Sequence, residues 1–251
     1  MRQTNQISFD PGKESQHILC PRKPVGGSFK ILGISFDTRL LMNLAIDDVT
    51  RHAKWKVVVL NRVRRFYMVS DMVRLWKSDV LSFIEYRTPA ISHASQSMLS
   101  HIDALQESYL RDLGLSSLDA LVHFNLAPLA CRRDIALLGV IHRAVLGLGP
   151  THFHEYFRPP WRWTKPQTQH QRHRYHLQDM MGTHFLEVVR NSMFGLIRIY
   201  NLLDPSIIES RSVSSFQAKC QQVALSRAMS GCDDWHQTFS PRIPLFRHPL
   251  R

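Results

Sequence analysis

The chain has 251 residues, and 44% of them are hydrophobic, so it can bury a sizeable core and does not have the composition of a disordered protein. Its formal net charge of +12 favours a polyanionic partner, with nucleic acid as the first candidate and an anionic membrane surface as the second. No stretch reaches the ~18 consecutive apolar residues of a membrane-spanning helix, and the polar N-terminus lacks a secretory signal, so we expect an intracellular protein, either nuclear or cytoplasmic.

Residues 1–36 are predicted to form a small β unit. Residues 7–9 and 16–19 have the composition of short strands, and the turn-forming segment Asp10-Pro11-Gly12-Lys13 lies between them. A third β-rich run follows at residues 29–36. Gly33 inside this run predicts a β-bulge or the close approach of another backbone.

From residue 37 to residue 157 the apolar residues recur at helical spacing, which predicts a domain of several helices. The first helix begins at a cap formed by Asp37 or Thr38. Its apolar face comprises Leu41, Ala45, Val49 and Ala53. A second helix is capped by Ser70, and its apolar stripe comprises Val73, Trp76, Val80, Phe83 and Ile84.

Three further helices are predicted in the same region. The first of them ends at Gly114 and carries on one face Met98, Ile102, Leu105 and Tyr109. A short helix at residues 118–122 ends before Pro128. The last helix covers residues 130–146 and is closed by Gly147.

Residues 158–182 form a basic segment rich in Pro, Trp, His and Arg, which we predict to be a loop. Trp161 and Trp163 lie among basic residues there and either anchor the loop on the core or stack on unpaired bases. A dense run of histidines surrounds this segment: His152, His154, His170, His173, His176 and His184. Because no cysteine or carboxylate flanks them at zinc-finger spacing, we predict no metal site and favour a polar loop that gains charge below about pH 6.5.

The C-terminal part is predicted to be helical over residues 183–230 and extended and basic over residues 231–251. One helix covers residues 183–203 and stops at Asp204 and Pro205. Another begins at a capping box of Ser214 and Gln217 and continues to about residue 229. The expected fold class is therefore mainly α, with a small N-terminal β-hairpin or sheet, a multi-helix bundle and a C-terminal helical region.

Several short motifs resemble, in their order, the C-terminal part of a non-LTR (LINE-type) retrotransposon reverse transcriptase. Asp10-Pro11-Gly12-Lys13 resembles the turn late in the palm of that family, and Lys30-Ile31-Leu32-Gly33 resembles its primer-grip strand, with Ile31 in place of the usual aromatic residue. Downstream, the thumb and closing segments of the family are similar to Leu105-Gln106, to residues 131–147 beginning Cys131-Arg132-Arg133, and to Ser214-Ser215-Phe216-Gln217.

This resemblance implies that residues 1–36 are the last edge of the palm and residues 37–157 a thumb-like domain of an RNA-directed DNA polymerase. The carboxylates that hold two Mg²⁺ ions in such polymerases are expected before residue 5, so we expect no catalytic residue, no metal ligand and no cofactor in this chain, and no activity of the chain alone. Asp233 and Asp234 are assigned to a solvated turn. Without its partner strands, the β unit is expected to expose strand edges and apolar side chains.

The expected partner is an RNA/DNA duplex, contacted through its backbone. Family likeness places Lys13 near the phosphates of the incoming nucleotide, and Lys30 and Gly33 near the primer end. The remaining candidate nucleic-acid-binding residues are Arg62, Arg64, Arg65, Lys77, Arg132 and Arg133. Two alternatives stay open: the cluster at Arg62–Arg65 is an ordinary solvated face, or the chain is a free-standing helical protein that binds nucleic acid or another protein without catalysis.

Overall fold

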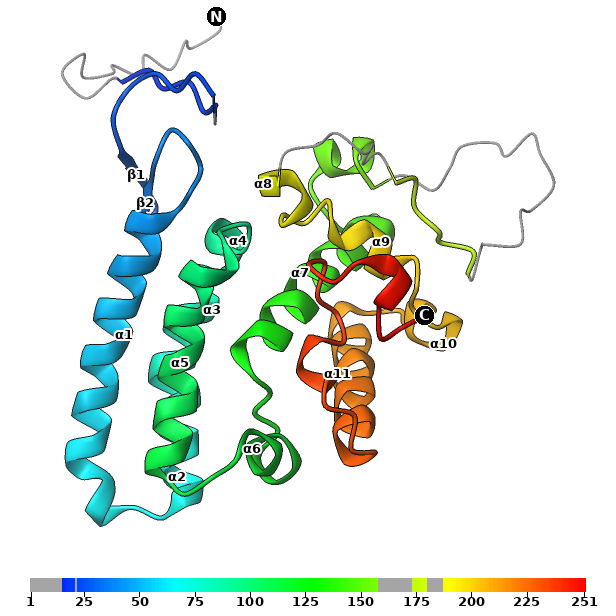
Figure 1. The fold of residues 1–251 in the computed structure, drawn as a ribbon. Coiled ribbons are helices and arrows are strands. Elements are labelled where there is room, and N and C mark those ends of the chain that lie inside the picture. Colours follow the sequence, from blue (N-terminus) through cyan, green and yellow to red (C-terminus); the bar gives the residue numbers. More distant parts are fainter. Residues whose placement is uncertain (1–14, 21, 158–172, 180–186) are drawn as a thin grey trace, which may run out of the picture.

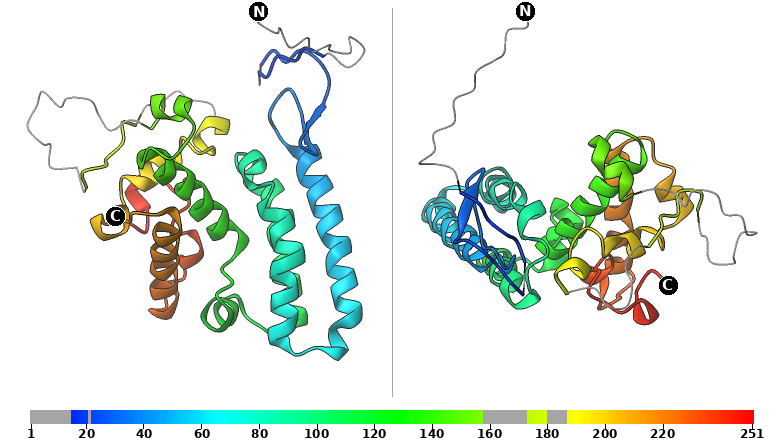
Figure 2. Two further views of the ribbon diagram at one scale, coloured as in Figure 1. Left: turned by 180° about the vertical axis from the view of Figure 1, so that it is seen from behind. Right: turned by 90° about the horizontal axis from the view of Figure 1, so that it is seen from above.

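A computed structural model of the chain describes residues 15–20, 22–157, 173–179 and 187–251. They form a mainly helical protein with one small two-stranded antiparallel sheet near the N-terminus, which confirms the predicted fold class. Figures 1 and 2 show two lobes side by side: one of long helices below the sheet, and one of shorter helices that ends at the C-terminus. In the described ranges, no helix combines the length and apolar character needed to cross a membrane.

The sheet is a hairpin made of β1 (Phe29–Ile31) and β2 (Ile34–Phe36). Leu32 and Gly33, with φ of 50° and 77°, form the two-residue turn between the strands, as a type I′ turn requires. The prediction of a bulge at Gly33 was therefore wrong, because this glycine turns the chain back on itself. The strand expected at residues 16–19 is reduced to a single bridge between Ile18 and Val25, and the one expected at residues 7–9 lies outside the described residues.

Helix α1 (Asn43–Val63) begins six residues after the predicted cap at Asp37. The Asp37 carboxylate instead accepts hydrogen bonds from the backbone N–H groups of Arg39, Leu41 and Met42, so it holds the loop that leads into the helix. Met42 occupies the N-cap position with φ of 60°. Ala45, Val49 and Ala53 lie on the buried face as predicted, while Leu41, which precedes the helix, is exposed.

A short 3₁₀ turn, η2 (Arg64–Phe66), ends α1, and the chain then reverses into a second helical stretch. This stretch consists of α2 (Val69–Leu75), the π-helical segment η3 (Trp76–Leu81) and α3 (Ser82–Glu85). The predicted apolar stripe is correct in that Val73, Trp76, Val80 and Ile84 are buried and Phe83 is partly buried. The predicted cap at Ser70 was wrong, since Met68 occupies the N-cap position without a side-chain bond.

The N-terminal lobe is completed by α4 (Thr88–Ile91) and α5 (Gln96–Asp112). Ser95 caps α5, and Gly114, with φ of 73°, follows its end as predicted. The lobe's core is apolar, and at its centre the indole of Trp76 stacks on the ring of Tyr109 with centroids 4.6 Å apart. The Tyr109 hydroxyl donates to the carbonyl oxygen of Met72 at 2.8 Å, so α5 is tied to α2 by one buried hydrogen bond.

Helix α6 (Ser117–Phe124) joins the two lobes and starts with a capping box between Ser116 and Asp119. The C-terminal lobe then contains α7 (Leu129–Val145), η4 (Thr151–Glu155), α8 (Glu187–Arg190), α9 (Leu196–Tyr200), α10 (Pro205–Ile208) and α11 (Val213–Met229). Its core is separate from that of the N-terminal lobe, and the buried apolar residues of α7 belong to it from Cys131 onward, whereas Leu129 belongs to the N-terminal core. The division between the cores thus falls near α6 rather than at residue 157, where the predicted thumb-like domain ended.

Two predictions in the C-terminal lobe were wrong, the continuous helix at residues 183–203 and the cap of the last long helix. The single helix expected at residues 183–203 is interrupted between α8 and α9, where the carbonyl oxygen of Arg190 approaches Gly195 so closely that an added Cβ would lie 1.8 Å from it. No helix continues through Asp204, as predicted, and Asp204 caps a separate short helix, α10, by accepting from the N–H of Ser206. The cap of α11 is Ser212, two residues before the predicted Ser214.

The C-terminal segment is folded rather than extended. It contains η5 (Trp235–Gln237) and η6 (Leu245–Arg247), and the side chain of Phe239 is buried in the core of the C-terminal lobe. The Arg242 guanidinium donates to the carbonyl oxygens of Ser92 and Ala94 at 2.9 Å, between α4 and α5. This segment therefore contacts both lobes, which the basic and proline-rich composition of residues 239–251 did not indicate.

Candidate nucleic-acid interface

The two faces of α1 differ sharply in their surroundings. Ala45, Ile46, Val49, Ala53 and Leu60 face the core, whereas the opposite face meets solvent. We call this opposite face the α1 outer face, and it comprises Arg51, Lys54, Trp55, Val58, Val59 and Arg62, all of them exposed. Their spacing of three or four residues places them in one stripe along the helix. The Trp55 side chain is 68% exposed, so this stripe combines positive charge with apolar surface.

The turn after α1 continues this surface. We call residues 62–69 the tip, which lies at the end of α1 far from the hairpin (Figure 1). Arg62, Arg64 and Arg65 are all exposed there. Phe66 and Met68 are 69% and 76% exposed. The Arg65 guanidinium lies over the ring of Phe66, 4.7 Å from its centroid, so one cation is held against one face of an exposed aromatic ring.

Four cations of this surface are not neutralised. Arg51 pairs with Asp48 at 2.5 Å, and Lys56, at the edge of α1, pairs with Asp79. In the described part of the chain, no ion pair is formed by Lys54, Arg62, Arg64 or Arg65. Exposed and unpaired basic side chains of this kind can neutralise phosphates and release their counterions.

The hairpin carries Lys30 and Gly33 at the opposite end of α1. Lys30 is exposed and lines a shallow hollow with Asp47, Asp48 and Arg51, so the charge at this end is mixed, whereas the tip is positive. At 1.5 Å per residue, the 21-residue α1 is about 32 Å long, close to the roughly 34 Å of one turn of duplex DNA. Lys30 and the tip are thus too distant to hold one phosphate, but they can reach phosphates about one turn apart. Lys13 lies outside the described residues.

Lys77 and Arg132, predicted from the sequence as phosphate-binding residues, make contacts inside the protein. The Lys77 ammonium donates to the carbonyl oxygen of Phe124 at the end of α6. Burial, and secondarily the nearby Arg132 guanidinium, lowers the pKa of Lys77. Arg132 pairs with Glu85 at 2.6 Å and so connects α7 to α3. The structure brings these two residues together with each other and not with the α1 outer face.

Arg133 is the most deeply buried of the candidates. Its side chain is 6% exposed and donates two hydrogen bonds to the Asp103 carboxylate, at 2.6 and 2.8 Å. This bidentate pair joins α7 to α5 and thereby one lobe to the other. Because the guanidinium is covered and already bonded to Asp103, Arg133 does not present a free cation to a phosphate in this structure.

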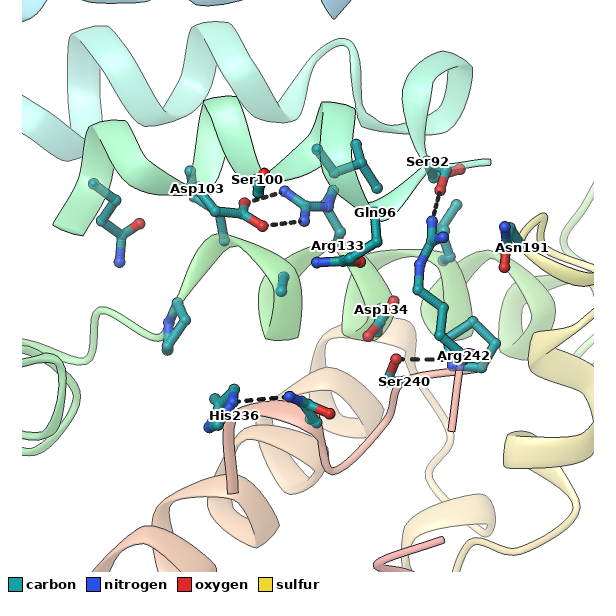
Figure 3. A pocket seen from close by; sticks show the side chains of 18 of the residues that line it. Ser92, Gln96, Ser100, Asp103, Arg133, Asp134, Asn191, His236, Ser240 and Arg242 are labelled. Carbon is teal, nitrogen blue, oxygen red and sulfur yellow. Dashed lines mark hydrogen bonds and ion pairs between the residues drawn. The ribbon is translucent and has the colours of Figure 1, made fainter. Parts of the chain in front are cut away.

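A cavity of about 620 Å³ lies beside this ion pair, between α5, α7 and the C-terminal segment (Figure 3). Asp134, Ser240 and Arg242 line it together with the Asp103–Arg133 pair. Burial raises the pKa of Asp134 to about 7, although the nearby Arg133 and Arg242 guanidinium groups act in the opposite direction. Among the described residues, no hydrogen bond joins Asp134 to a serine or histidine of the cavity.

The predicted histidine run is only partly described. His173 and His176 have ring centroids 6.0 Å apart, and the Nε2 atom of His173 hydrogen-bonds to the carbonyl oxygen of Tyr200 at 3.1 Å. His170, His184, Trp161 and Trp163 lie outside the described residues. No group of three or more His, Cys, Asp or Glu side chains is placed to hold a metal ion in the ranges that the structure describes.

The chain matches no protein-family model, no curated protein and no solved structure. The candidate interface therefore depends on the residues themselves. Sequence reasoning identified Arg62, Arg64 and Arg65 but did not include Trp55 or Phe66. The signal for Trp55 was its position two residues beyond Ala53, on the helix side opposite the alanine and valine stripe.

Proposed function

We propose that this chain binds nucleic acid by its phosphate backbone through the α1 outer face and the arginines of the tip. The observation that carries this proposal is the set of exposed cations without ion-pair partners in the described residues, namely Lys54, Arg62, Arg64 and Arg65. A net charge of +12 for the whole chain adds long-range attraction for a polyanion. Backbone contacts of this type position a duplex without reading its sequence.

The rigidity of α1 supports the same role. Its buried face packs along α5, and Asn61 near its end donates to the Asp112 carboxylate at 3.1 Å. The cations on its other face are therefore presented on a fixed rod and not on a loop, so a duplex meets them without first ordering the backbone. Side-chain ordering remains the main entropic cost of the contact.

We further propose that this part corresponds to the thumb of a non-LTR reverse transcriptase, which holds the template–primer duplex. The motif order that begins at Lys30 and continues through Arg132 supports this assignment, as does a helical lobe that directly follows a small hairpin. We propose no bond-forming chemistry for this chain, and Mg²⁺ is expected only in a complete polymerase of this kind.

A salt titration of binding tests the proposal. The full chain is titrated against a blunt fluorescent RNA/DNA hybrid at several salt concentrations, and the anisotropy gives Kd. If the four cations contact phosphates, log Kd against log salt has a slope of magnitude about 3 to 4. A slope near zero would contradict the proposal.

A matched pair of variants locates the interface. Arg64→Ala combined with Arg65→Ala removes two charges from the tip and should lower the slope by about 2. Arg211→Ala combined with Arg247→Ala removes two exposed charges from the C-terminal lobe and so matches the change in net charge. The control pair should leave the slope unchanged. Equal weakening by both pairs would place the binding surface elsewhere.

A further inference from the structure

The tip presents two neighbouring aromatic rings that the fold does not use. Phe66 is 69% exposed and Tyr67 is 51% exposed. Tyr67 has an extended backbone, with φ of −128° and ψ of 150°, so it ends the 3₁₀ turn and leaves the helical path. In the part of the chain that the structure describes, neither ring stacks on another aromatic side chain. Their surface is therefore available to a ligand.

Arginines surround these rings. The Arg65 guanidinium already covers one face of Phe66, and Arg62 and Arg64 are exposed within the same turn. A ligand that fits this arrangement carries flat apolar groups alternating with negative charges. Unpaired nucleotides have this chemistry, because each base offers a π-face and each linkage a phosphate.

We propose that the tip is a stacking site for unpaired bases, so that the chain recognises the junction at which a single strand leaves a duplex. This inference rests on the proposed function, because it keeps the duplex on the cations of the α1 outer face and the tip and assigns the departing strand to the rings of Phe66 and Tyr67. The two surfaces are continuous through Arg62, which belongs to both. Phe66 and Tyr67 supply the stacking, and the adjacent arginines contact the phosphates.

An anionic membrane surface is the competing ligand for aromatic and basic residues together. Interfacial membrane binding normally uses one apolar face along a whole amphipathic helix. Here the exposed aromatic residues sit in a turn, and the α1 outer face that continues them carries Arg51, Lys54 and Arg62 between its apolar residues. These basic side chains are thus spread along the length of α1, in the same way as phosphates are spread along a nucleic acid strand.

The experiment compares three nucleic acids with the full chain: a blunt RNA/DNA hybrid, the same hybrid with a short single-stranded tail, and the same hybrid with an abasic tail of equal length. We expect the tailed hybrid to bind roughly tenfold more tightly than the blunt one, and the abasic tail to give little of this gain. Equal binding of the normal and abasic tails would overturn the proposal, since the gain would then come from phosphates alone.

Two double variants test the residues. Phe66→Ala combined with Tyr67→Ala should remove the preference for the tail and leave binding of the blunt hybrid unchanged. The control is Tyr86→Ala combined with Phe246→Ala, which also removes one exposed Tyr and one exposed Phe that lie beside arginines. The control should keep the preference. Loss of the preference in both, or equal weakening on blunt and tailed hybrids in the tip variant, would contradict the assignment.

Vesicle sedimentation tests the membrane alternative, and the salt dependence of blunt-hybrid binding tests the proposed function separately. Vesicles containing phosphatidylserine are sedimented with the wild type and the tip variant, and we expect no difference between them. Vesicle binding that depends on Phe66 and Tyr67, together with an unchanged tail preference, would assign the tip to a membrane instead. A blunt hybrid that binds without salt dependence would refute the proposed function alone, because the tail preference is measured independently.

Discussion

The two lobes are stabilised in different ways. The core of the N-terminal lobe is built from long helices with regular apolar stripes, and the polar contacts inside it include isolated hydrogen bonds from the Tyr109 hydroxyl and the Gln106 side-chain amide. The core of the C-terminal lobe encloses a polar network, in which the His142 ring bonds to the Tyr200 hydroxyl at 3.0 Å and to the Ser210 carbonyl oxygen at 2.9 Å. An apolar core can therefore be predicted from the spacing of apolar residues along the chain. A polar interior cannot, because its hydrogen-bond partners lie far apart in the sequence.

The largest effect is expected from the centre of the N-terminal lobe. Trp76→Ala removes a fully buried indole that stacks on Tyr109, and it should lower the free energy of unfolding by about 3–5 kcal/mol. Urea denaturation followed by circular dichroism measures this loss. A loss below about 1 kcal/mol would mean that the lobe repacks and that its stripe is not the source of its stability.

The next effect concerns the connection between the lobes. Arg133→Met leaves the Asp103 carboxylate without its partner in a largely covered position, which should cost about 3 kcal/mol. Combining it with Asp103→Asn should recover part of that loss, because no unpaired charge then remains. Separate unfolding transitions for the two lobes in the single variant would show that this pair couples them. An unchanged midpoint would contradict the role assigned to it.

A smaller effect is expected from the pH dependence of the free energy of unfolding, through Asp134 at the interface between the lobes. Because burial raises the pKa of Asp134 to about 7, its contribution to stability is fully present below the ordinary carboxyl pKa near 4 and is lost as the pH rises toward 7. Asp134→Asn removes this loss and should stabilise the protein by about 2 kcal/mol at pH 8, with no gain at pH 4. Unfolding in urea at both pH values measures the difference. A gain at pH 4 that equals the gain at pH 8 would argue against titration of this group.

The smallest effect on stability is expected at Trp55, which makes it the counterpart of Trp76. Trp55→Ala should change the free energy of unfolding by no more than about 0.5 kcal/mol, since the side chain is exposed on the α1 outer face. The affinity of the Trp55→Ala variant for the RNA/DNA hybrid, measured by fluorescence anisotropy, should nevertheless fall severalfold. A stability loss comparable with that of Trp76→Ala would show that Trp55 packs against the protein and does not face a ligand.

Much of the N-terminal lobe could be predicted from the sequence, because its helices are marked by local signals in the residues that form them. The stop of α5 at Gly114 follows from a glycine that adopts a positive φ, and the buried stripe from Val73 to Ile84 follows from spacing alone. The small N-terminal β unit was predicted, but the turn at residues 32–33 was missed, because Leu32 is an unusual residue for the first position of a type I′ turn, which favours Asn or Asp.

The remaining differences have tertiary causes. The break before Gly195 depends on the approach of the Arg190 carbonyl, and the burial of Arg133 depends on Asp103, 30 residues earlier. Neither contact can be predicted from the residues next to it in the sequence. For the candidate site, charge identified Arg62, Arg64 and Arg65, whereas the exposure of Phe66 and Tyr67 became visible only once the turn was folded.

The bond from Arg242 to Ser92 spans 150 positions of the chain, which has a consequence for biogenesis. During synthesis, the helices of the N-terminal lobe leave the ribosome and can pack long before Arg242 exists. Until then, the carbonyl groups of Ser92 and Ala94, between α4 and α5, can bond only to water or to other parts of the chain. We therefore expect this contact between the two lobes to form only after residue 242 has been synthesised.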